Sequence, residues 1–416
     1  MTQTDLTELR GRYDRGENPG LTSVCSAHPL VIEAALVHAA DRGQSALIEA
    51  TCNQVNQDGG YTGMTPASFR DFVFGIAGRV GFARERIILG GDHLGPNPWK
   101  SLPPEAAMQK AELMIAAYAG AGFTKLHLDA SMGCAGEAAH LPDEIVAERA
   151  VRLARAAEAA APGKACYVIG TEIPTPGGAT EALDHVVPTT PDAVKKTYAV
   201  HEAAFRAALP DMWPRVIGIV VQPGVEFGHD DVAIYAPEPA RDLVATLAKL
   251  PGLVFEAHST DYQPGASLSR LRKDGFCILK VGPELTFALR EALYGLDAIR
   301  MFRTPGAESL PDTMEAVMLR SPADWRSHYH GTPAEQRVLR HFSYSDRIRY
   351  YWPAPEARKA VDALLSDSGG ATIPETMLSQ YLPRFLERVK SGVLKAEPRE
   401  ILIQSVRDVL ERYETR

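Results

Sequence analysis

Histidine and acidic residues follow several apolar, β-branched segments of the chain, at positions where they could act together. His93, His229 and His258 each follow a different segment, and Glu172 follows another. Three imidazoles and a carboxylate form a ligand set that suits Zn²⁺, with Mn²⁺ or another divalent ion as alternatives. Asp92 directly precedes His93 and would be the natural proton carrier beside such a metal. A single histidine at such a position is more often a structural hydrogen-bond partner, so the prediction depends on the three meeting at one point.

Further polar residues near these segments could bind a sugar or support the metal. Glu49 and Asp129 could each orient another side chain or bind a hydroxyl group, but each could equally hydrogen-bond a loop amide or cap a helix. Asn53 and Gln54 belong to an amide-rich loop that could recognise sugar hydroxyls, although such loops also form common turns. We expect His127 to be a buried hydrogen-bond partner rather than a metal ligand.

Basic residues in two places could bind an anionic group. Lys280 ends the last apolar segment, where barrel proteins often bind phosphate, and the turn at Gly282 could add backbone N–H donors. Arg347 and Arg349 lie in an aromatic and basic segment, 344–353, and planar guanidinium groups bind phosphate through paired hydrogen bonds. The alternative is that this segment is a salt-bridged helix that packs its aromatic rings on the rest of the protein.

The elements that must position these residues alternate between residues 20 and 296. Short apolar segments are followed by longer ones of helical periodicity, as in repeated strand–helix units around a parallel sheet. Eight of each predict a closed (β/α)8 barrel, an α/β fold whose functional residues lie at the carboxyl ends of the strands. The competing doubly wound sheet would usually carry a glycine-rich phosphate turn after its first strand, and Ser26-Ala-His-Pro29 stands there instead. The strands are expected at 23–26, 45–50, 86–90, 125–128, 166–170, 216–222, 253–257 and 276–281. The helices are expected near 29–42, 66–82, 104–121, 143–161, 191–208, 238–249, 264–274 and 284–296.

The length of the chain leaves room for more than a barrel. A typical barrel has about 250 residues, and this chain has 416. We assign residues 1–296 to the barrel and residues 297–416 to a helical C-terminal extension that packs on it or on a neighbouring subunit. The helices of the extension are expected around 334–341, 355–366, 374–391 and 397–413.

The composition of the chain indicates which kinds of partner it can bind. The chain is 45% hydrophobic and 23% charged with a formal net charge of −8, and it has no run of Lys and Arg that would bind nucleic acid or anionic lipid. No segment offers the roughly 18 continuous apolar residues of a membrane span. Its five cysteines lack CxxC pairs or regular spacing, as expected for reduced core thiols. We therefore expect a cytoplasmic protein that binds a small metabolite.

Several longer motifs resemble one known family. The sequences SVCSAHPLVIEAAL, IEATCNQVNQDGGYTGMTP, ERIILGGDHLGPNPW, VIGTEIPTPGG, VVQPGVEFGH, EAHSTDYQ and SDRIRYYWP resemble the GatZ/KbaZ family of tagatose-1,6-bisphosphate aldolase subunits. The resemblance covers nearly the whole chain and is weaker in residues 1–19 and near 302–335. It implies a (β/α)8 barrel related to class II, metal-dependent aldolases. On this resemblance Asp92 matches the proton carrier, His93, His229 and His258 match the metal ligands, and Glu172 is a weaker fourth.

The resemblance implies two alternative functions. Some members look like non-catalytic partners that stabilise a separate catalytic aldolase subunit, while others are similar to enzymes that interconvert tagatose 6-phosphate and fructose 6-phosphate at C4. We expect a metal-dependent ketohexose-phosphate 4-epimerase that works by retro-aldol and aldol steps, and a homo-oligomer. Its acid/base groups would be Asp92 and either Asp129 or Glu49, with Lys280 and Arg347 or Arg349 on the phosphate.

Overall fold

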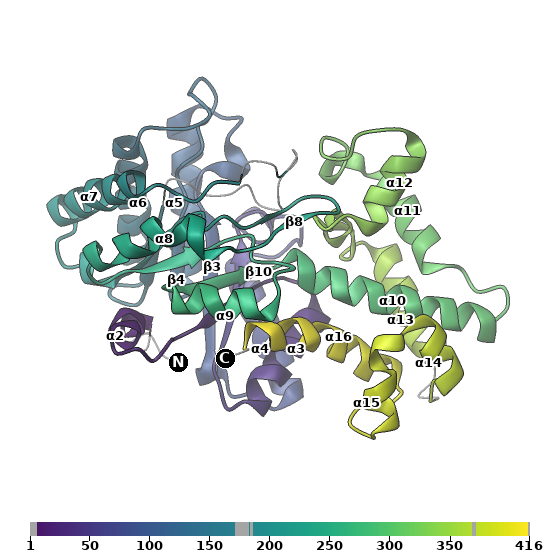
Figure 1. The fold of residues 1–416 in the computed structure, drawn as a ribbon. Helices are drawn as coiled ribbons and strands as arrows, with labels where there is room; N and C mark the ends of the chain where they lie inside the picture. The colour runs from purple at the N-terminus through teal and green to yellow at the C-terminus, as the bar shows by residue number, and fades with distance from the viewer. Residues whose placement is uncertain (1–5, 171–182, 184–185, 368–371, 415–416) are drawn as a thin grey trace.

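The computed structural model describes residues 6–170, 183, 186–367 and 372–414. Eight parallel strands close into a barrel in the order β1-β10-β9-β6-β5-β4-β3-β2, with helices around them (Figure 1). The expected (β/α)8 fold is confirmed. The barrel strands are β1 (Leu21–Cys25), β2 (Ala46–Thr51), β3 (Ile87–Leu94), β4 (Lys125–Leu128), β5 (Cys166–Ile169), β6 (Val216–Val220), β9 (Val254–Ala257) and β10 (Phe276–Val281). A separate antiparallel pair, β7 (Glu226–Phe227) and β8 (Val232–Ala233), lies in the connection after β6.

Most helices begin where the sequence places a proline or a capping hydroxyl in the first turn. Thr65 accepts a hydrogen bond from the Ser68 backbone N–H at the start of α4 (Pro66–Val80), and Thr332 forms a capping box with Glu335 at the start of α12 (Pro333–Phe342). A short helix, α2 (Leu9–Asp14), precedes the barrel. The helices of the barrel are α3 (Pro29–Asp41), α4 (Pro66–Val80), α5 (Pro104–Gly120), α6 (Asp143–Ala160), α7 (Pro191–Ala208), α8 (Pro237–Thr246), α9 (Gly265–Lys273) and α10 (Pro283–Arg303). The later ones are α11 (Leu310–Arg320), α12 (Pro333–Phe342), α13 (Pro355–Asp367), α14 (Glu375–Tyr381), α15 (Leu386–Lys390) and α16 (Pro398–Tyr413).

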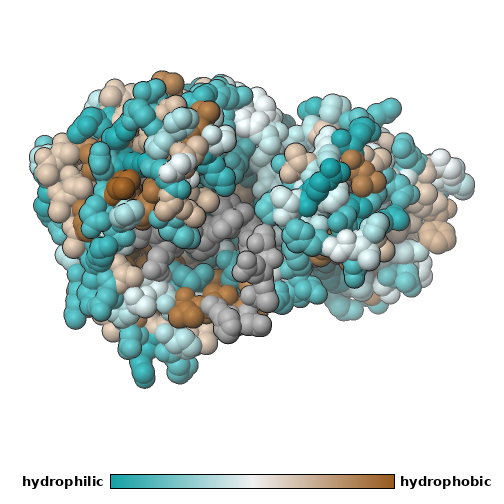
Figure 2. Space-filling model, turned by 90° about the horizontal axis from the view of Figure 1, so that it is seen from above, coloured by the Kyte–Doolittle hydropathy of each residue, from teal (hydrophilic) through white to brown (hydrophobic). Residues whose placement is uncertain are grey.

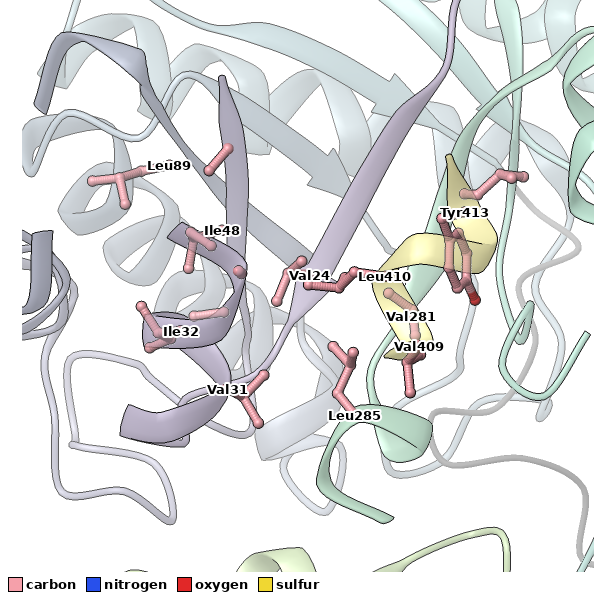
Figure 3. Packing of buried hydrophobic residues seen from close by; sticks show 14 of the residues in the cluster. Val24, Val31, Ile32, Ile48, Leu89, Val281, Leu285, Val409, Leu410 and Tyr413 are labelled. Atoms are coloured by element: carbon pink, nitrogen blue, oxygen red, sulfur yellow. The ribbon is translucent and has the colours of Figure 1, made fainter. Parts of the chain in front are cut away.

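The last helix, α16, belongs to the layer of helices around the barrel. It packs against α3 and α10, and the Tyr413 hydroxyl donates to the Thr260 carbonyl oxygen over 2.8 Å. Figure 3 shows Leu410 and Tyr413 of α16 beside Val281 at the end of β10. Burying these apolar side chains removes them from water and ties the end of the chain to the barrel. The expected division at residue 296 lies inside α10, and α16 returns to the barrel from beyond it.

Residues 310–367 and 372–394 form a lobe beside the barrel, which Figure 2 shows from above with a mostly hydrophilic surface. A 3₁₀ helix in this lobe, η6 (Arg347–Tyr351), lies close to the loops at the carboxyl ends of the strands. The Tyr262 hydroxyl donates to the Tyr344 carbonyl oxygen, and the Tyr344 backbone N–H donates to the His229 carbonyl oxygen, both over 2.7 Å. In the part of the chain that the structure describes, no helix is long and apolar enough to cross a membrane.

Candidate metal and catalytic site

A cavity opens where the barrel strands end, and residues from distant parts of the sequence line it. The rim of the barrel contributes polar side chains, and η6 of the C-terminal lobe covers one side. Its lining includes Asn53, Gln54, Tyr61, Asp92, His93, His258, Asp261, Lys280, Arg349 and Tyr350. The lobe therefore supplies part of the wall of the candidate site.

Strand β3 carries Asp92 and His93 into this cavity. The sequence predicted that this strand ends at residue 90, but it continues to Leu94, so both residues lie within the strand. The pairing of β3 with β4 shifts register between Gly91 and Leu94, and His93 has a φ of 49°. A left-handed backbone is uncommon for histidine and is typical of a bulge that redirects a side chain.

Three histidine rings meet at the wall of the cavity, where His93 and His258 line it and His127 does not. The ring centroids of His93, His127 and His258 lie 5.0 to 5.2 Å from one another. The Nδ1 atom of His127 lies 2.9 Å from Asp92 Oδ1, and its buried Nε2 atom has no hydrogen-bond partner among the described residues. His127 is therefore the buried hydrogen-bond partner that the sequence suggested, and its second ring nitrogen faces two predicted ligands without a hydrogen-bond partner among the described residues.

The donor set fits a divalent cation. Asp92, His127, Glu256 and His258 each offer one ligand atom, and these four atoms lie within 4.8 Å of one another. Burial and the nearby Lys280 ammonium lower the pKa of His258 to about 3, so its imidazole is neutral and can act as a ligand. Nitrogen and carboxylate oxygen donors of this kind suit zinc and similar metals.

His229 lies outside this group of donors. Its Nδ1 atom is 3.0 Å from the Ser343 hydroxyl, and its ring packs edge-on against Tyr329 with centroids 5.4 Å apart. The reason is that the chain forms the β7–β8 pair after β6, which carries His229 beyond the strand end and onto the C-terminal lobe. Glu172, the other predicted ligand, falls outside the described residues.

Asp129 orients His93. Its Oδ2 atom lies 2.8 Å from His93 Nδ1, and its Oδ1 atom accepts a 2.8 Å hydrogen bond from the Ser131 hydroxyl. Burial opposes ionisation of Asp129, yet the His93 and Ser131 hydrogen bonds hold its pKa well below the usual range. Burial also opposes a charge on His93, but Asp92 and Asp129 raise the pKa of its imidazole. The negative field that attracts a proton here would equally attract a metal ion.

Lys280 lines the cavity and also belongs to a buried ion cluster. Its ammonium contacts the carboxylates of Asp92 and Glu49, the latter over 2.7 Å. Burial opposes its charge, but Asp92 and its other neighbours hold the pKa of Lys280 well above the usual value. Burial likewise opposes ionisation of Asp92, and His93 and Lys280 keep its pKa well below the usual value. Glu49 is completely buried behind the cavity, where it pairs with lysines.

The backbone donors expected near Gly282 are already used. The N–H groups of Gly282 and Glu284, at the start of α10, donate to Asp261 Oδ1 over 2.9 and 2.8 Å. A carboxylate of the protein thus occupies the helix N-terminus where a substrate phosphate was expected. Burial raises the pKa of Asp261 to about 7, with the Gly282 hydrogen bond opposing the rise.

Of the two arginines predicted to bind phosphate, Arg349 is at the cavity. Its guanidinium lies over the Tyr350 ring at 4.5 Å and donates to the Asp346 carbonyl oxygen over 2.9 Å. Arg347 does not line the cavity and donates to the Asp324 carbonyl oxygen over 2.9 Å. Both arginines lie in the 3₁₀ helix η6. The alternative to phosphate binding, a segment that packs on the rest of the protein, therefore describes Arg347, while Arg349 remains available at the cavity.

The predicted sugar-binding amides are also at the cavity. Asn53 and Gln54 both line it, and Gln54 Oε1 accepts a 2.9 Å hydrogen bond from the Thr51 backbone N–H. That bond fixes the start of the loop, and the Gln54 side chain also hydrogen-bonds Tyr61, another residue of the lining.

Sequence reasoning missed Lys125 and Glu256, and it identified His127 as a buried hydrogen-bond partner but not as a candidate metal ligand. All three lie inside barrel strands, in the segments Lys-Leu-His-Leu and Val-Phe-Glu-Ala, and are completely buried. The signal was present, because a charged residue inside a short strand that is covered by helices must point into the barrel.

The barrel, its polar rim and the buried group of histidines and carboxylates define a (β/α)8 protein with a candidate metal-dependent active site. Comparison with known proteins gives the family. A family model described as D-tagatose-1,6-bisphosphate aldolase subunit GatZ/KbaZ-like matches residues 6–416. The chain belongs to this family, as its motifs indicated.

Two relatives match the chain over almost its full length. The D-tagatose 6-phosphate 4-epimerase of Agrobacterium fabrum is 53% identical over 415 residues, which cover 98% of this chain and 97% of the relative. A crystal structure described as a probable tagatose 6 phosphate kinase from Sinorhizobium meliloti is 55% identical with a TM-score of 0.89, covering 95% of this chain and 99% of that one. The descriptions of these two relatives name different reactions, an epimerisation and a phosphoryl transfer, and both name tagatose 6-phosphate.

Proposed function

We propose that this protein is a metal-dependent 4-epimerase that interconverts D-tagatose 6-phosphate and D-fructose 6-phosphate. The observation that carries the proposal is the convergence of Asp92, His127, Glu256 and His258 at one buried point that borders a cavity. The name of the Agrobacterium fabrum relative supports the substrate and the reaction. A purely stabilising subunit would have no need for this buried, charged arrangement, which costs desolvation energy.

The metal would be held by His127, His258 and Glu256 of the four-donor group, and Asp92, its fourth member, would act as the proton carrier. His93, whose ring lies 5.2 and 5.0 Å from the rings of His127 and His258, would be a further donor. When bound, a divalent ion supplies a Lewis acid that polarises the C2 carbonyl of the ketose. Zn²⁺ is the ion that this set of donors favours, and Mn²⁺ is the alternative. Asp129 holds the His93 ring through its Nδ1 atom, as carboxylates commonly do for metal-ligating histidines.

The chain's own groups then account for inversion at C4. Asp92 accepts the proton of the C4 hydroxyl, the C3–C4 bond breaks, and its electron pair passes to the C2–C3 unit while C4 becomes an aldehyde. The aldehyde fragment rotates within the cavity and presents its opposite face. The C3–C4 bond forms again, and Asp92 returns the proton to the new C4 hydroxyl. Asn53 and Gln54 are placed to hold the sugar hydroxyls during this exchange.

The test is to incubate the purified, metal-loaded protein with tagatose 6-phosphate and measure fructose 6-phosphate and triose products. We expect fructose 6-phosphate with little triose, and loss of this activity in His93→Ala. Deuterium at C4 should remain in the product, since no C–H bond breaks in this route. A protein that is inert with every metal and active only after a catalytic aldolase subunit is added would overturn the proposal.

Arg349→Ala is expected to raise KM for tagatose 6-phosphate by roughly 10- to 100-fold, the loss of a charge-assisted phosphate contact of about 1.5–3 kcal/mol. Its kcat should change much less, because the phosphate is remote from C4. Arg347→Ala is the matched control, since Arg347 lies two residues away and outside the cavity lining. Steady-state kinetics of both variants provide the measurement. An equal rise in KM for the two would contradict an anchoring role for Arg349.

Two further features complete the proposal. We infer a cytoplasmic enzyme, in keeping with cysteines that are free thiols, such as the buried Cys52 and Cys277. We also propose that it is a homo-oligomer, which sedimentation of the purified protein would test.

A further inference from the structure

A completely buried ion bridge lies beneath the group of metal donors. The Lys125 ammonium is 2.8 Å from Glu49 Oε1 and 2.7 Å from Glu256 Oε2, and all three side chains have no exposed surface. Lys125 does not line the cavity. It can therefore affect the reaction only through the two carboxylates that it joins.

The strand register makes room for this bridge. Glu49 of β2 is paired with Gly90 of β3, and Gly90 is paired with Lys125 of β4. A Cβ atom on Gly90 would lie 2.5 Å from Glu49 Oε1 and 2.6 Å from its Cγ atom, which is closer than real contacts allow. The missing side chain at position 90 thus lets Glu49 and Lys125 meet across the intervening strand.

The two carboxylates connect Lys125 to His258 and to Asp92 of the candidate site, and Lys280 lies near both of them, 2.7 Å from Glu49 and 3.6 Å from Glu256. Glu256 Oε1 lies 3.0 Å from His258 Nε2, so Glu256 sets the orientation of that ring. Glu49 Oε2 lies 2.7 Å from Lys280, whose ammonium contacts Asp92. Lys125 contacts both carboxylates, so it is linked to His258 through Glu256 and to Asp92 through Glu49 and Lys280.

Barrel interiors are normally filled by branched apolar side chains, and a buried ion pair is seldom the most stable filling. Stability alone therefore does not explain why three carboxylates and two ammonium groups lie inside this barrel. We propose that Lys125 is a positioning residue that fixes Glu256 and Glu49, and through them His258 and Asp92, in the arrangement that binds the metal. The inference rests on the metal site of the proposed function.

The test is the affinity of the full-length protein for Zn²⁺, measured by competition with a chromophoric chelator. Lys125→Met keeps most of the side-chain volume and removes the charge, and we expect zinc binding about 10- to 100-fold weaker, the range for lost supporting contacts around a metal. KM for tagatose 6-phosphate should stay near the wild-type value, because Lys125 is away from the cavity. Arg215→Met is the control, since Arg215 bridges Glu158 over 2.6 Å and has no described contact with the donors. It should lower stability without weakening zinc binding.

Gly90→Ala is the second variant, and it retains every charge. The new methyl group must displace the Glu49 carboxylate, so zinc binding should weaken in the same direction even if Lys125→Met does not fold. Wild-type zinc affinity in a folded Lys125→Met protein, or in Gly90→Ala when the first variant is unfolded, would overturn the role of Lys125. A wild-type protein that binds no divalent metal would instead refute the metal site itself, and this inference with it.

Discussion

Asp92→Asn is expected to lower kcat for epimerisation by about 10³-fold, within the range for loss of a general acid/base group. Asparagine has nearly the same shape but cannot accept the C4 hydroxyl proton. It also removes the negative charge that Lys280 and His127 contact, so the ionised state that prepares Asp92 for proton transfer is lost. The measurement is the rate of fructose 6-phosphate formation at saturating tagatose 6-phosphate, with the metal content of each preparation determined in parallel.

Asp129→Asn is the matched control for this prediction. Asp129 is also a buried aspartate beside His93, but its contact is with Nδ1, where it orients the ring. Its loss should act mainly through metal affinity, so excess Zn²⁺ should restore part of the activity of Asp129→Asn and none of that of Asp92→Asn. An Asp92→Asn protein that retains a tenth or more of the wild-type kcat would exclude Asp92 as the proton carrier.

The fold was predictable because the strand and helix patterns of a parallel barrel are local. Each strand is short and apolar, and each following helix begins with recognisable capping residues such as Thr65 and Thr190. The pattern does not predict the position of α16. This helix packs against α3 and α10, which lie far from it in the sequence, and local periodicity carries no information about such contacts. Helical periodicity identifies an apolar face but not the surface that it covers.

The candidate site was only partly predictable, for a different reason. Polar residues near strand ends are visible in the sequence, and so is the basic, aromatic segment that contains Arg349. The residues identified in this way that lie at the cavity are Asp92, His93, His258, Asn53, Gln54, Lys280 and Arg349. Residues that act from within strands, such as Lys125 and Glu256, become neighbours only when the barrel closes and fixes the register. His229 differs because an irregular connection intervenes between β6 and the residue, and no local pattern predicts its path.

Removing divalent metal with a strong chelator is expected to abolish epimerase activity, and adding Zn²⁺ or Mn²⁺ should restore it. The buried ion cluster has a formal excess of one negative charge, because the carboxylates of Asp92, Glu49 and Glu256 outnumber the ammonium groups of Lys125 and Lys280. A bound cation offsets this charge and stabilises the folded state, by about 4 kcal/mol when free metal is 1,000 times the dissociation constant. The melting temperature should therefore rise with metal concentration in the wild type. The melting temperature should respond far less in His258→Ala, which lacks one donor. In His229→Ala it should respond as in the wild type, because His229 contacts Ser343 and Tyr329 instead of the donors.

Full activity in protein shown by elemental analysis to be metal-free would rule out metal-assisted cleavage of the C3–C4 bond. If the metal-dependent rise in melting temperature disappeared in His229→Ala, the β7–β8 connection would have to move so that His229 becomes a ligand of the bound metal.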